Sequence, residues 1–331
     1  MNNYLGICIP TFNRADYLNE NLCSIVPQFA KHDLPIFISD NCSSDDTCNV
    51  VKQFQKVYSN ISYHKNSYNM GLYRNILSAI KMAKTDYLWM MGDDDVIIKA
   101  SVDRIIEKLK TNPDFIVLNS VGYDSTMRIS HGNSFKCSRD RVFLPGFHED
   151  LLTFLSGFYH GFMSAMIIKR SILSNLIEEF ENSNFELFNN IWLPLMIFYK
   201  AIVNRAGLFL CEPALQMRLN HRPSEKNFFQ YFYIDHLNAL LFLKEAGYSL
   251  KSLRRAAKLG PVSAIVQAMR GMSDGNKLIS YSDMIRHCPI IPIGDKYTFL
   301  IVDQTPTFLL RALTRIISKL NSDVKIHFEI V

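Results

Sequence analysis

The sequence has no long apolar run and no targeting segment. A membrane span needs about 18 consecutive apolar residues, and the nearest candidate, residues 191–203, is interrupted by Pro194 and Lys200. The N-terminal stretch MNNYLGICIP lacks a basic region, and its apolar part is too short for a signal peptide. We therefore expect the chain to face the cytosol.

Cysteine pairs and dense basic stripes are also missing. The seven cysteines are scattered, odd in number and include no CxxC pair, so the sequence predicts neither a zinc site nor a disulfide framework. The net charge of +5 is a mild excess without the basic stripe typical of nucleic-acid binding. Nucleic acid is therefore disfavoured as a partner, whereas phosphates or an acidic membrane face fit this charge.

The composition indicates a sizeable folded protein. At 331 residues, 48% of them hydrophobic, the chain can bury a large core in one domain plus an appendage, or in two domains. Strands are predicted at 4–9, 35–39, 61–64, 87–91 and 115–119, alternating with helices at 15–30, 45–58, 72–83 and 101–110. This βα repeat predicts an α/β fold with a mainly parallel central sheet, helices on both faces, and the strand-to-helix loops at one edge.

The segment YLWMMGDDDVII, residues 87–98, carries the strongest functional signal. An apolar, aromatic strand ends here in three consecutive carboxylates, Asp93, Asp94 and Asp95. Ligands bind at the C-terminal edge of the strands in open α/β sheets, and hard oxygen ligands at this density suit Mg²⁺ or Mn²⁺ carrying a phosphate substrate. The alternative is a solvated acidic turn or the N-terminus of a helix, where carboxylates favour the positive end of the dipole.

The other strand-to-helix loops carry further polar residues. Arg14 and Arg74 have the forked donors that suit phosphate oxygens, although each alone could equally be a surface ion-pair residue. Asp40 lies at the end of a predicted strand, where its carboxylate can accept from a base N–H or a ribose hydroxyl. Residues 43–46 are typical of N-cap chemistry, and Gly71 indicates either a positive φ or close approach to a ligand.

Four segments stand in order at the ends of these strands: CIPTFNR at 8–14, ISDNCSSDD at 38–46, NMGLYRN at 69–75 and GDDD at 92–95. Together they resemble the successive signatures of family 2 glycosyltransferases with the GT-A fold. The resemblance covers about the first 120 residues well and weakens towards about residue 225. It implies a nucleotide-binding sheet whose ligand is a nucleoside-diphosphate sugar.

The resemblance implies that residues of these segments surround the donor nucleotide. Those expected in the pocket are Thr11, Asn13 and Arg14, with Asp40 at the base and Asn69, Gly71 and Arg74 near the base and diphosphate. The acidic segment departs from the usual Asp-x-Asp-Asp form, because Gly92 stands at one position of the first Asp.

The acidic segment is expected to hold a divalent metal, Mn or Mg. We expect Asp94 as the direct ligand, with Asp93 towards the ribose and Asp95 towards the water shell of the metal or the sugar. Such an ion stabilises the negative charge that develops on the departing nucleoside diphosphate.

Two later segments extend the resemblance towards the acceptor. QMRLNHRPSE at 216–225 follows a strand predicted at 208–211 and is similar to the end of the catalytic domain in this family. There His221 is a candidate metal ligand, equally well a surface or packing residue, and Arg222 a candidate diphosphate contact. GFMSAMIIKR at 161–170 resembles the strand beneath the acceptor site, although it could equally be ordinary core.

Direct displacement needs a base for the acceptor hydroxyl, and only Glu186 stands where the family places one. The paired acid that usually follows is absent, and Glu186 could instead be a charge at a helix N-terminus. Inverting and retaining courses therefore both stay open.

From about residue 228 the pattern becomes helical, with helices predicted at 228–247, 250–270 and 307–320. The last places Arg311, Arg315 and Lys319 beside an apolar stripe, which fits either an anionic membrane surface or docking on the main domain. We expect a GT-A domain at 1–225, with nucleotide-sugar binding at 1–120 and the acceptor side at 121–225, and a helical, membrane-peripheral region at 226–331.

Within the family, the chain looks most like bacterial enzymes of O-antigen or other surface polysaccharide assembly, of the abequosyltransferase type. That similarity implies a CDP-linked dideoxyhexose donor such as CDP-abequose and a polyprenyl-diphosphate-linked oligosaccharide acceptor at the cytoplasmic face of the inner membrane. One alternative is a sugar nucleotidyltransferase, although the Gly-rich, basic loop that grips a triphosphate is missing after the first strand. Another is a non-catalytic saccharide-binding or assembly module.

Overall fold

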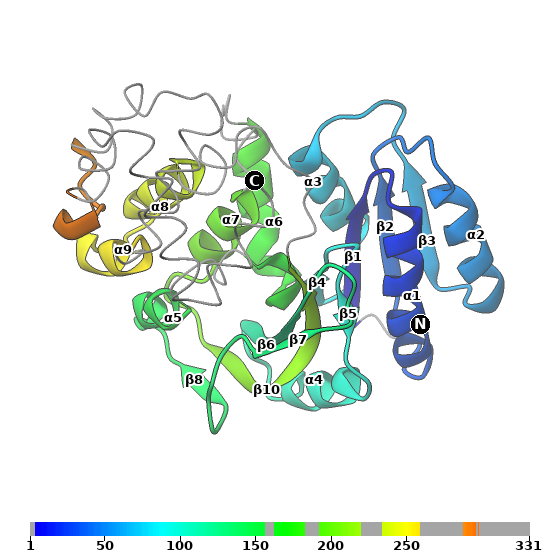
Figure 1. Ribbon diagram of the computed structural model, residues 1–331, viewed down its shortest axis with the longest axis horizontal. Helices are drawn as coiled ribbons and strands as arrows, with labels where there is room; N and C mark the ends of the chain where they lie inside the picture. The colour runs from blue at the N-terminus through cyan, green and yellow to red at the C-terminus, as the bar shows by residue number, and fades with distance from the viewer. Residues whose placement is uncertain are drawn as a thin grey trace, which may run out of the picture. The chain divides into compact units, whose positions relative to one another are not determined.

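The computed structural model describes residues 4–155, 162–182, 192–219, 234–258, 287–295 and 297 (Figure 1). The chain divides into two compact units. The first comprises residues 1–151, 161–189 and 193–221, and the second comprises residues 152–160, 190–192 and 222–331.

The first unit begins with the predicted alternation of strands and helices. Its elements are β1 (Leu5–Thr11), α1 (Ala15–Ala30), β2 (Ile36–Asp40), α2 (Thr47–Val57), β3 (Ile61–Lys65), α3 (Leu72–Met82) and β4 (Tyr87–Met90). β1 is buried along its whole length, as expected for a central strand of a parallel sheet. On α1, Leu18, Leu22 and Ile25 form a buried stripe of helical spacing. α1 packs against α2, and α3 packs against β1 and β2 (Figure 1).

The rest of the first unit extends this sheet. Its elements are β5 (Val96–Ile97), α4 (Ser101–Leu109), β6 (Phe115–Tyr123), β7 (Ser130–Asn133), β8 (Arg141–Phe143), the 3₁₀ turn η2 (Met163–Ala165), β9 (Met166–Lys169), α6 (Arg170–Asn182), α7 (Leu193–Ala201) and β10 (Gly207–Arg218). α5 (His148–Phe154) spans the sequence boundary between the units.

The strands form one sheet with the central order β3-β2-β1-β4-β9-β6-β10-β5, and β7 pairs with β6 while β8 pairs with β10. β1 pairs in parallel with β2 and β4, β2 with β3, and β6 with β10. Because β9 is antiparallel to both β4 and β6, the strands β1, β2, β3, β4, β6 and β10 all run in one direction. The predicted α/β class with a mostly parallel central sheet is therefore confirmed.

The insertion of β9 beside β4 places the turn η2 under the end of β4. Trp89 on β4 is fully buried, and its indole N–H donates to the Ser164 carbonyl at 2.7 Å. The same ring lies 6.3 Å, centroid to centroid, from that of Phe29 on α1. The end of β4 is thus anchored to α1 and to η2 before the acidic segment begins.

β10 is much longer than the strand predicted at 208–211. It runs from Gly207 to Arg218, and its pairing with β6 shifts register between Leu210 and Leu215. Glu212 and Pro213 lie inside this irregularity, and a local break of this kind lets a strand change direction without ending. Its continuation carries Arg218 to the edge of the sheet.

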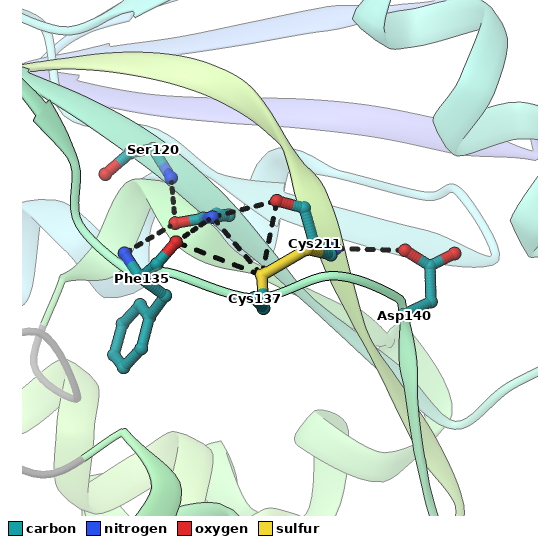
Figure 2. Close-up of a disulfide and its surroundings, with 6 residues drawn as sticks. Ser120, Phe135, Cys137, Asp140 and Cys211 are labelled. Carbon is teal, nitrogen blue, oxygen red and sulfur yellow. Dashed lines mark hydrogen bonds between the residues drawn. A yellow bond between two sulfur atoms is a disulfide. The ribbon is translucent and has the colours of Figure 1, made fainter.

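Among the described residues a single disulfide, between Cys137 and Cys211, joins the segment between β7 and β8 to β10 (Figure 2). The sequence, which predicts no disulfide framework, did not predict this bridge. The two residues are 74 positions apart with Cα atoms 5.7 Å apart. Asn119 Nδ2 donates to the Cys211 carbonyl at 2.8 Å, and Asp140 Oδ1 accepts from the Cys211 N–H at 3.0 Å. Scattered cysteines carry no spacing signal for such a bridge, because the sheet alone brings them together.

The second unit contains α8 (Asp235–Glu245) and α9 (Leu250–Ala256), both inside predicted helical ranges. α9 is preceded by the N-cap Ser249, whose hydroxyl oxygen accepts from the Ser252 N–H at 3.3 Å, which is the usual chemistry of an N-cap serine. Among the helices in the described part of the chain, none has the length and apolar character needed to cross a membrane.

Candidate functional site

The acidic segment follows β4 at the same edge of the sheet as the loop after β1, because these two strands pair in parallel. Thr11 Oγ1 donates to Asp93 Oδ2 at 2.8 Å. Arg14 Nη1 donates to Asp93 Oδ1 at 2.8 Å and to Asp94 Oδ2 at 3.0 Å. The structure therefore brings together four of the predicted site residues, taken from two loops about 80 residues apart in sequence.

Side chains from α1 and η2 fix the backbone of the acidic segment. Asn21, a fully buried polar residue on α1, donates through Nδ2 to the carbonyls of Gly92 at 3.1 Å and Asp95 at 2.7 Å. The Ser164 hydroxyl accepts from the Gly92 N–H at 2.8 Å and donates to Asp95 Oδ2 at 2.6 Å. These four bonds hold the turn from both sides.

Gly92 stands at its position because there is little room for a side chain. A Cβ atom there would lie 3.2 Å from Asp94 Oδ1 and Asp95 Oδ2, and 3.3 Å from Ser164 Oγ. Glycine at position 92 thus leaves room for the carboxylates of Asp94 and Asp95, which lie close to it.

Arg218, at the end of β10, clamps the third side of the segment. Its Nε donates to the Asp94 carbonyl at 3.1 Å and its backbone N–H to Asp95 Oδ1 at 3.1 Å. The guanidinium also donates to the Ser125 carbonyl at 2.6 Å and forms an ion pair with Glu20 at 2.5 Å. Because only 3% of this side chain is exposed, its donors are committed to holding the protein together.

The three carboxylates consequently differ in their exposure and in how many of their oxygens are free to bind a ligand. Asp93 and Asp95 are buried, and both oxygens of each accept hydrogen bonds. Burial, followed by the nearby charge of Asp94, raises the pKa of both groups. The Asp94 side chain is 23% exposed, and among the described residues nothing donates to its Oδ1. Asp94 is therefore the carboxylate of this segment best placed to contact an incoming cation.

Asp40, predicted to contact a base, is fully buried at the end of β2. Its Oδ1 accepts from the Ser43 N–H at 2.8 Å and its Oδ2 from the Tyr63 hydroxyl at 2.6 Å. Burial, followed by this hydrogen bond, raises the pKa of Tyr63, so the phenol stays a donor. Asp40 thus has a structural role in the protein itself, and base recognition stays a prediction.

Asn13 links the first two loops from the left-handed region, at φ 51°. Its N–H donates to Ser43 Oγ at 2.8 Å, and its side-chain oxygen accepts from the Ser44 N–H at 2.7 Å. The N-cap of α2 is Asp46, which makes no side-chain cap bond, whereas the preceding Asp45 accepts from the Thr47 N–H through Oδ1 at 3.1 Å. The polar residues of this loop therefore serve mainly to order its backbone.

The third loop is tied to the second by amides. Asn41 Nδ2 donates to Asn69 Oδ1 at 2.6 Å, and the same oxygen accepts from the Gly71 N–H at 2.9 Å. Gly71 has φ +87°, and no atom lies within 4 Å of a Cβ built there. Of the two roles considered for Gly71, the positive φ accounts for the glycine within the protein.

Arg74 is exposed and lies apart from these bonds. It lines an open pocket of about 620 Å³ along α3, together with His64, Ser78 and Lys81 among others. Three of the predicted site residues, Glu186, His221 and Arg222, lie outside the described residues, as does the predicted helix at 307–320.

The described residues supply part of a metal site. No three His, Cys, Asp or Glu side chains among them converge so as to hold an ion by themselves. Mg²⁺ and Mn²⁺ commonly take one or two carboxylates and complete their coordination with substrate phosphates and water. Among the described carboxylates of this segment, Asp94 is the one whose exposure suits such a role.

Several residues that build this site carried no distinct signal in the sequence. They are Asn21, Asn75, Tyr63, Ser164 and Arg218. Asn75 was visible only as part of NMGLYRN, yet it donates to the carbonyls of Thr11 at 3.2 Å and Ser39 at 3.0 Å. A polar residue on the apolar stripe of α1, as Asn21 is, was the one local hint available.

The fold and the site define an α/β protein that presents a clamped acidic turn beside polar loops at one edge of its sheet. The model described as glycosyl transferase family 2 matches residues 6–177, which is just over half of the 331 residues. The chain belongs to this family, and the predicted family and GT-A fold are confirmed.

Two bacterial glycosyltransferases each match part of the chain. The abequosyltransferase RfbV of Salmonella typhimurium is 31% identical over 175 residues, 50% of this chain and 53% of that protein. The GalNAc(5)-diNAcBac-PP-undecaprenol beta-1,3-glucosyltransferase of Campylobacter jejuni is 34% identical over 105 residues, 31% of this chain and 34% of that protein. The chain thus matches about half of the first relative and a third of the second.

Solved structures are similar over most of the chain. TarS 1–349 of S. aureus in complex with UDP-GlcNAc has a TM-score of 0.57 at 15% identity, covering 91% of this chain and 90% of that one. The mannosyltransferase PcManGT from Pyrobaculum calidifontis, in complex with GDP-Man and Mn²⁺, has a TM-score of 0.56 at 10% identity, covering 92% and 86%. At these identities the likeness concerns the fold.

Proposed function

We propose that this protein transfers a sugar from a nucleoside-diphosphate donor to a saccharide hydroxyl. The observation that carries the proposal is the acidic turn, in which Asp94 is accessible while Arg14 contacts it from the neighbouring loop. Membership of glycosyl transferase family 2 supports the reaction class. The two bacterial relatives support a bacterial enzyme of surface polysaccharide assembly.

The donor we propose is a CDP-linked dideoxyhexose such as CDP-abequose, and the acceptor a polyprenyl-diphosphate-linked oligosaccharide. The first follows from the similarity to an abequosyltransferase, and the second from a relative whose name includes PP-undecaprenol. The reaction then belongs at the cytoplasmic face of the inner membrane, with residues 226–331 as a peripheral helical region.

Asp94 is the proposed ligand of a divalent metal, Mn or Mg, with His221 as a further contact. A bound metal supplies Lewis-acid stabilisation of the departing diphosphate. We propose that Arg14 and Arg222 contact phosphate oxygens. We propose that Thr11 orients Asp93 and that Asp93 contacts the ribose. The Mn²⁺ in the PcManGT complex supports the choice of ion.

The two predicted catalytic carboxylates are Glu186 and Asp95. Glu186 remains the proposed base for the acceptor hydroxyl. Asp95 has both oxygens engaged by Ser164 and the Arg218 N–H, so we propose that it acts by shaping the turn that carries Asp94. We propose that the nucleotide is surrounded by Asn13, Asn69, Gly71 and Arg74.

The proposal is tested by isothermal titration with CDP, UDP, GDP and dTDP, each with and without Mn²⁺. We expect one nucleoside diphosphate, CDP, to bind and Mn²⁺ to tighten it. Transfer from the matching nucleotide sugar to a lipid-linked saccharide then tests the reaction. If none of the four diphosphates binds, the proposal is contradicted. Preferential binding of a nucleoside triphosphate with a sugar 1-phosphate also contradicts it and points to a nucleotidyltransferase.

Replacing Asp40 by Asn should weaken donor binding by about 1–3 kcal/mol, the cost of losing a charged partner for a base or ribose donor. Calorimetry with the tightest nucleoside diphosphate measures the change. Tyr63→Phe is the matched control, because it removes the hydroxyl that donates to Asp40 and leaves the carboxylate in place. Equal affinities in wild type and a folded Asp40→Asn protein would reassign Asp40 to a purely structural role.

A further inference from the structure

The Arg14 guanidinium occupies the position where the acidic turn most needs positive charge. A single nitrogen, Nη1, bridges Asp93 Oδ1 at 2.8 Å and Asp94 Oδ2 at 3.0 Å. The Arg14 Cζ lies 5.5 Å from the centroid of the Tyr17 ring, which supports the guanidinium from α1. Burial lowers the pKa of Arg14, but the charges of Asp93 and Asp94 outweigh it and raise the pKa, so the group stays cationic.

The backbone that carries the two carboxylates is held in place by hydrogen bonds. Asn21 holds the carbonyls on either side of the pair, and Arg218 holds the carbonyl of Asp94. Asp93 is further fixed by the neutral hydroxyl of Thr11. Repulsion between neighbouring carboxylates is relieved by a cation or by protonation of one of them. Among the described residues, the cationic side chain that bridges Asp93 and Asp94 is Arg14.

We propose that Arg14 is a positioning residue that serves as the built-in counter-ion of the acidic turn, and that a divalent cation arriving at the open Oδ1 of Asp94 competes with Arg14 for the charge of this carboxylate. The inference rests on the proposed function, because it takes Asp94 as a metal ligand. Diphosphate oxygens offer the guanidinium an equally good forked partner. The cation and the nucleoside diphosphate therefore bind together, each favouring the other.

A shortage of ligands would also make the free cation bind weakly, since no complete metal site is found among the described residues. The two explanations differ in what happens when Arg14 is removed. If ligands alone are limiting, the loss of Arg14 changes nothing for Mn²⁺. If Arg14 competes for Asp94, its loss frees an oxygen and removes a positive charge, so Mn²⁺ binds more tightly.

The test measures Mn²⁺ binding without nucleotide, by calorimetry or by the electron paramagnetic resonance of free Mn²⁺, at about pH 8 to keep the carboxylates ionised. Arg14→Gln should tighten Mn²⁺ binding by about 10-fold, the usual size of a charged hydrogen bond. Arg14→Lys, which keeps the charge without the rigid fork, should fall between Arg14→Gln and wild type. Arg205→Gln is the matched control, because Arg205 is exposed and precedes the start of β10, the strand whose other end carries Arg218.

Titration with CDP, or with whichever of UDP, GDP and dTDP binds best, gives a second readout. The factor by which Mn²⁺ tightens diphosphate binding should be smaller in Arg14→Gln than in wild type. By thermodynamic linkage, the diphosphate must tighten Mn²⁺ binding by the same factor. A folded Arg14→Gln protein whose Mn²⁺ affinity is unchanged or weaker overturns the inference. If Arg14→Gln does not fold, the same comparison is made with Arg14→Lys, and an Mn²⁺ affinity no tighter than that of wild type overturns the inference. Failure of wild type to bind Mn²⁺ with any of the four diphosphates overturns the metal in the proposed function instead.

Discussion

Replacing Asp94 by Asn should lower the turnover of sugar transfer by at least ~100-fold, which is the loss expected when a main stabiliser of the leaving group is removed. Asp94 is the most exposed of the three carboxylates, and among the described residues its Oδ1 has no donor. The amide is nearly the same size, so the fold should persist while the metal loses its charged ligand. Initial rates with the matching nucleotide sugar and Mn²⁺ measure the effect.

Asp46→Asn provides the control for Asp94→Asn. Asp46 is an exposed loop carboxylate whose Oδ1 accepts from Asn49 Nδ2 at 2.6 Å, and it makes no contact with the acidic turn. The same chemical change there should leave turnover within about twofold of wild type, as is usual for surface substitutions. Excess EDTA should mimic Asp94→Asn. Full activity in Asp94→Asn, or in wild type with excess EDTA, rules out the metal-dependent mechanism.

The sequence was sufficient for those parts of the fold and site that depend on neighbouring residues. The apolar run before Asp93 had to be a buried strand, and observed β4 ends three residues before it. The βα alternation then placed the loops after β1, β2, β3 and β4 at one edge, by the handedness of parallel crossovers. The alternation thus predicts Arg14 and Asp94 at the same edge, and in the structure Arg14 Nη1 lies 3.0 Å from Asp94 Oδ2.

The parts that escaped prediction depend on strand partners distant in sequence. Nothing local in β9 shows that it enters the sheet antiparallel between β4 and β6, and this insertion alone brings Ser164 to Asp95, 69 residues away. The disulfide between Cys137 and Cys211 arises in the same way across β10. Asp40 was recognised as a strand-end carboxylate, but its partner Tyr63 comes from the adjacent strand β3.

Arg218 shows the same limit and leads to the second large effect. It lay inside the segment QMRLNHRPSE, where His221 and Arg222 drew attention as ligands, yet it is the buried side chain that ties β10 to the acidic turn. Replacing Arg218 by Met should lower the free energy of unfolding by about 2–4 kcal/mol, because the carbonyls of Asp94 and Ser125 lose their donor. Thermal and urea unfolding measure this loss.

The same Arg218→Met change should lower turnover by about 100-fold even well below its melting temperature, because a shift of about 1 Å in a catalytic group costs that much. Glu20→Gln removes the ion pair of Arg218 but keeps its hydrogen bonds to the carbonyls. Because Glu20 is 46% exposed, losing that pair should lower the free energy of unfolding by at most about 1 kcal/mol and change turnover little. Arg218→Lys keeps the charge without the fork and should lie between the two in both measurements. A destabilised Arg218→Met protein that turns over like wild type while still folded would show that Arg218 supports the sheet and that the position of Asp94 does not depend on it.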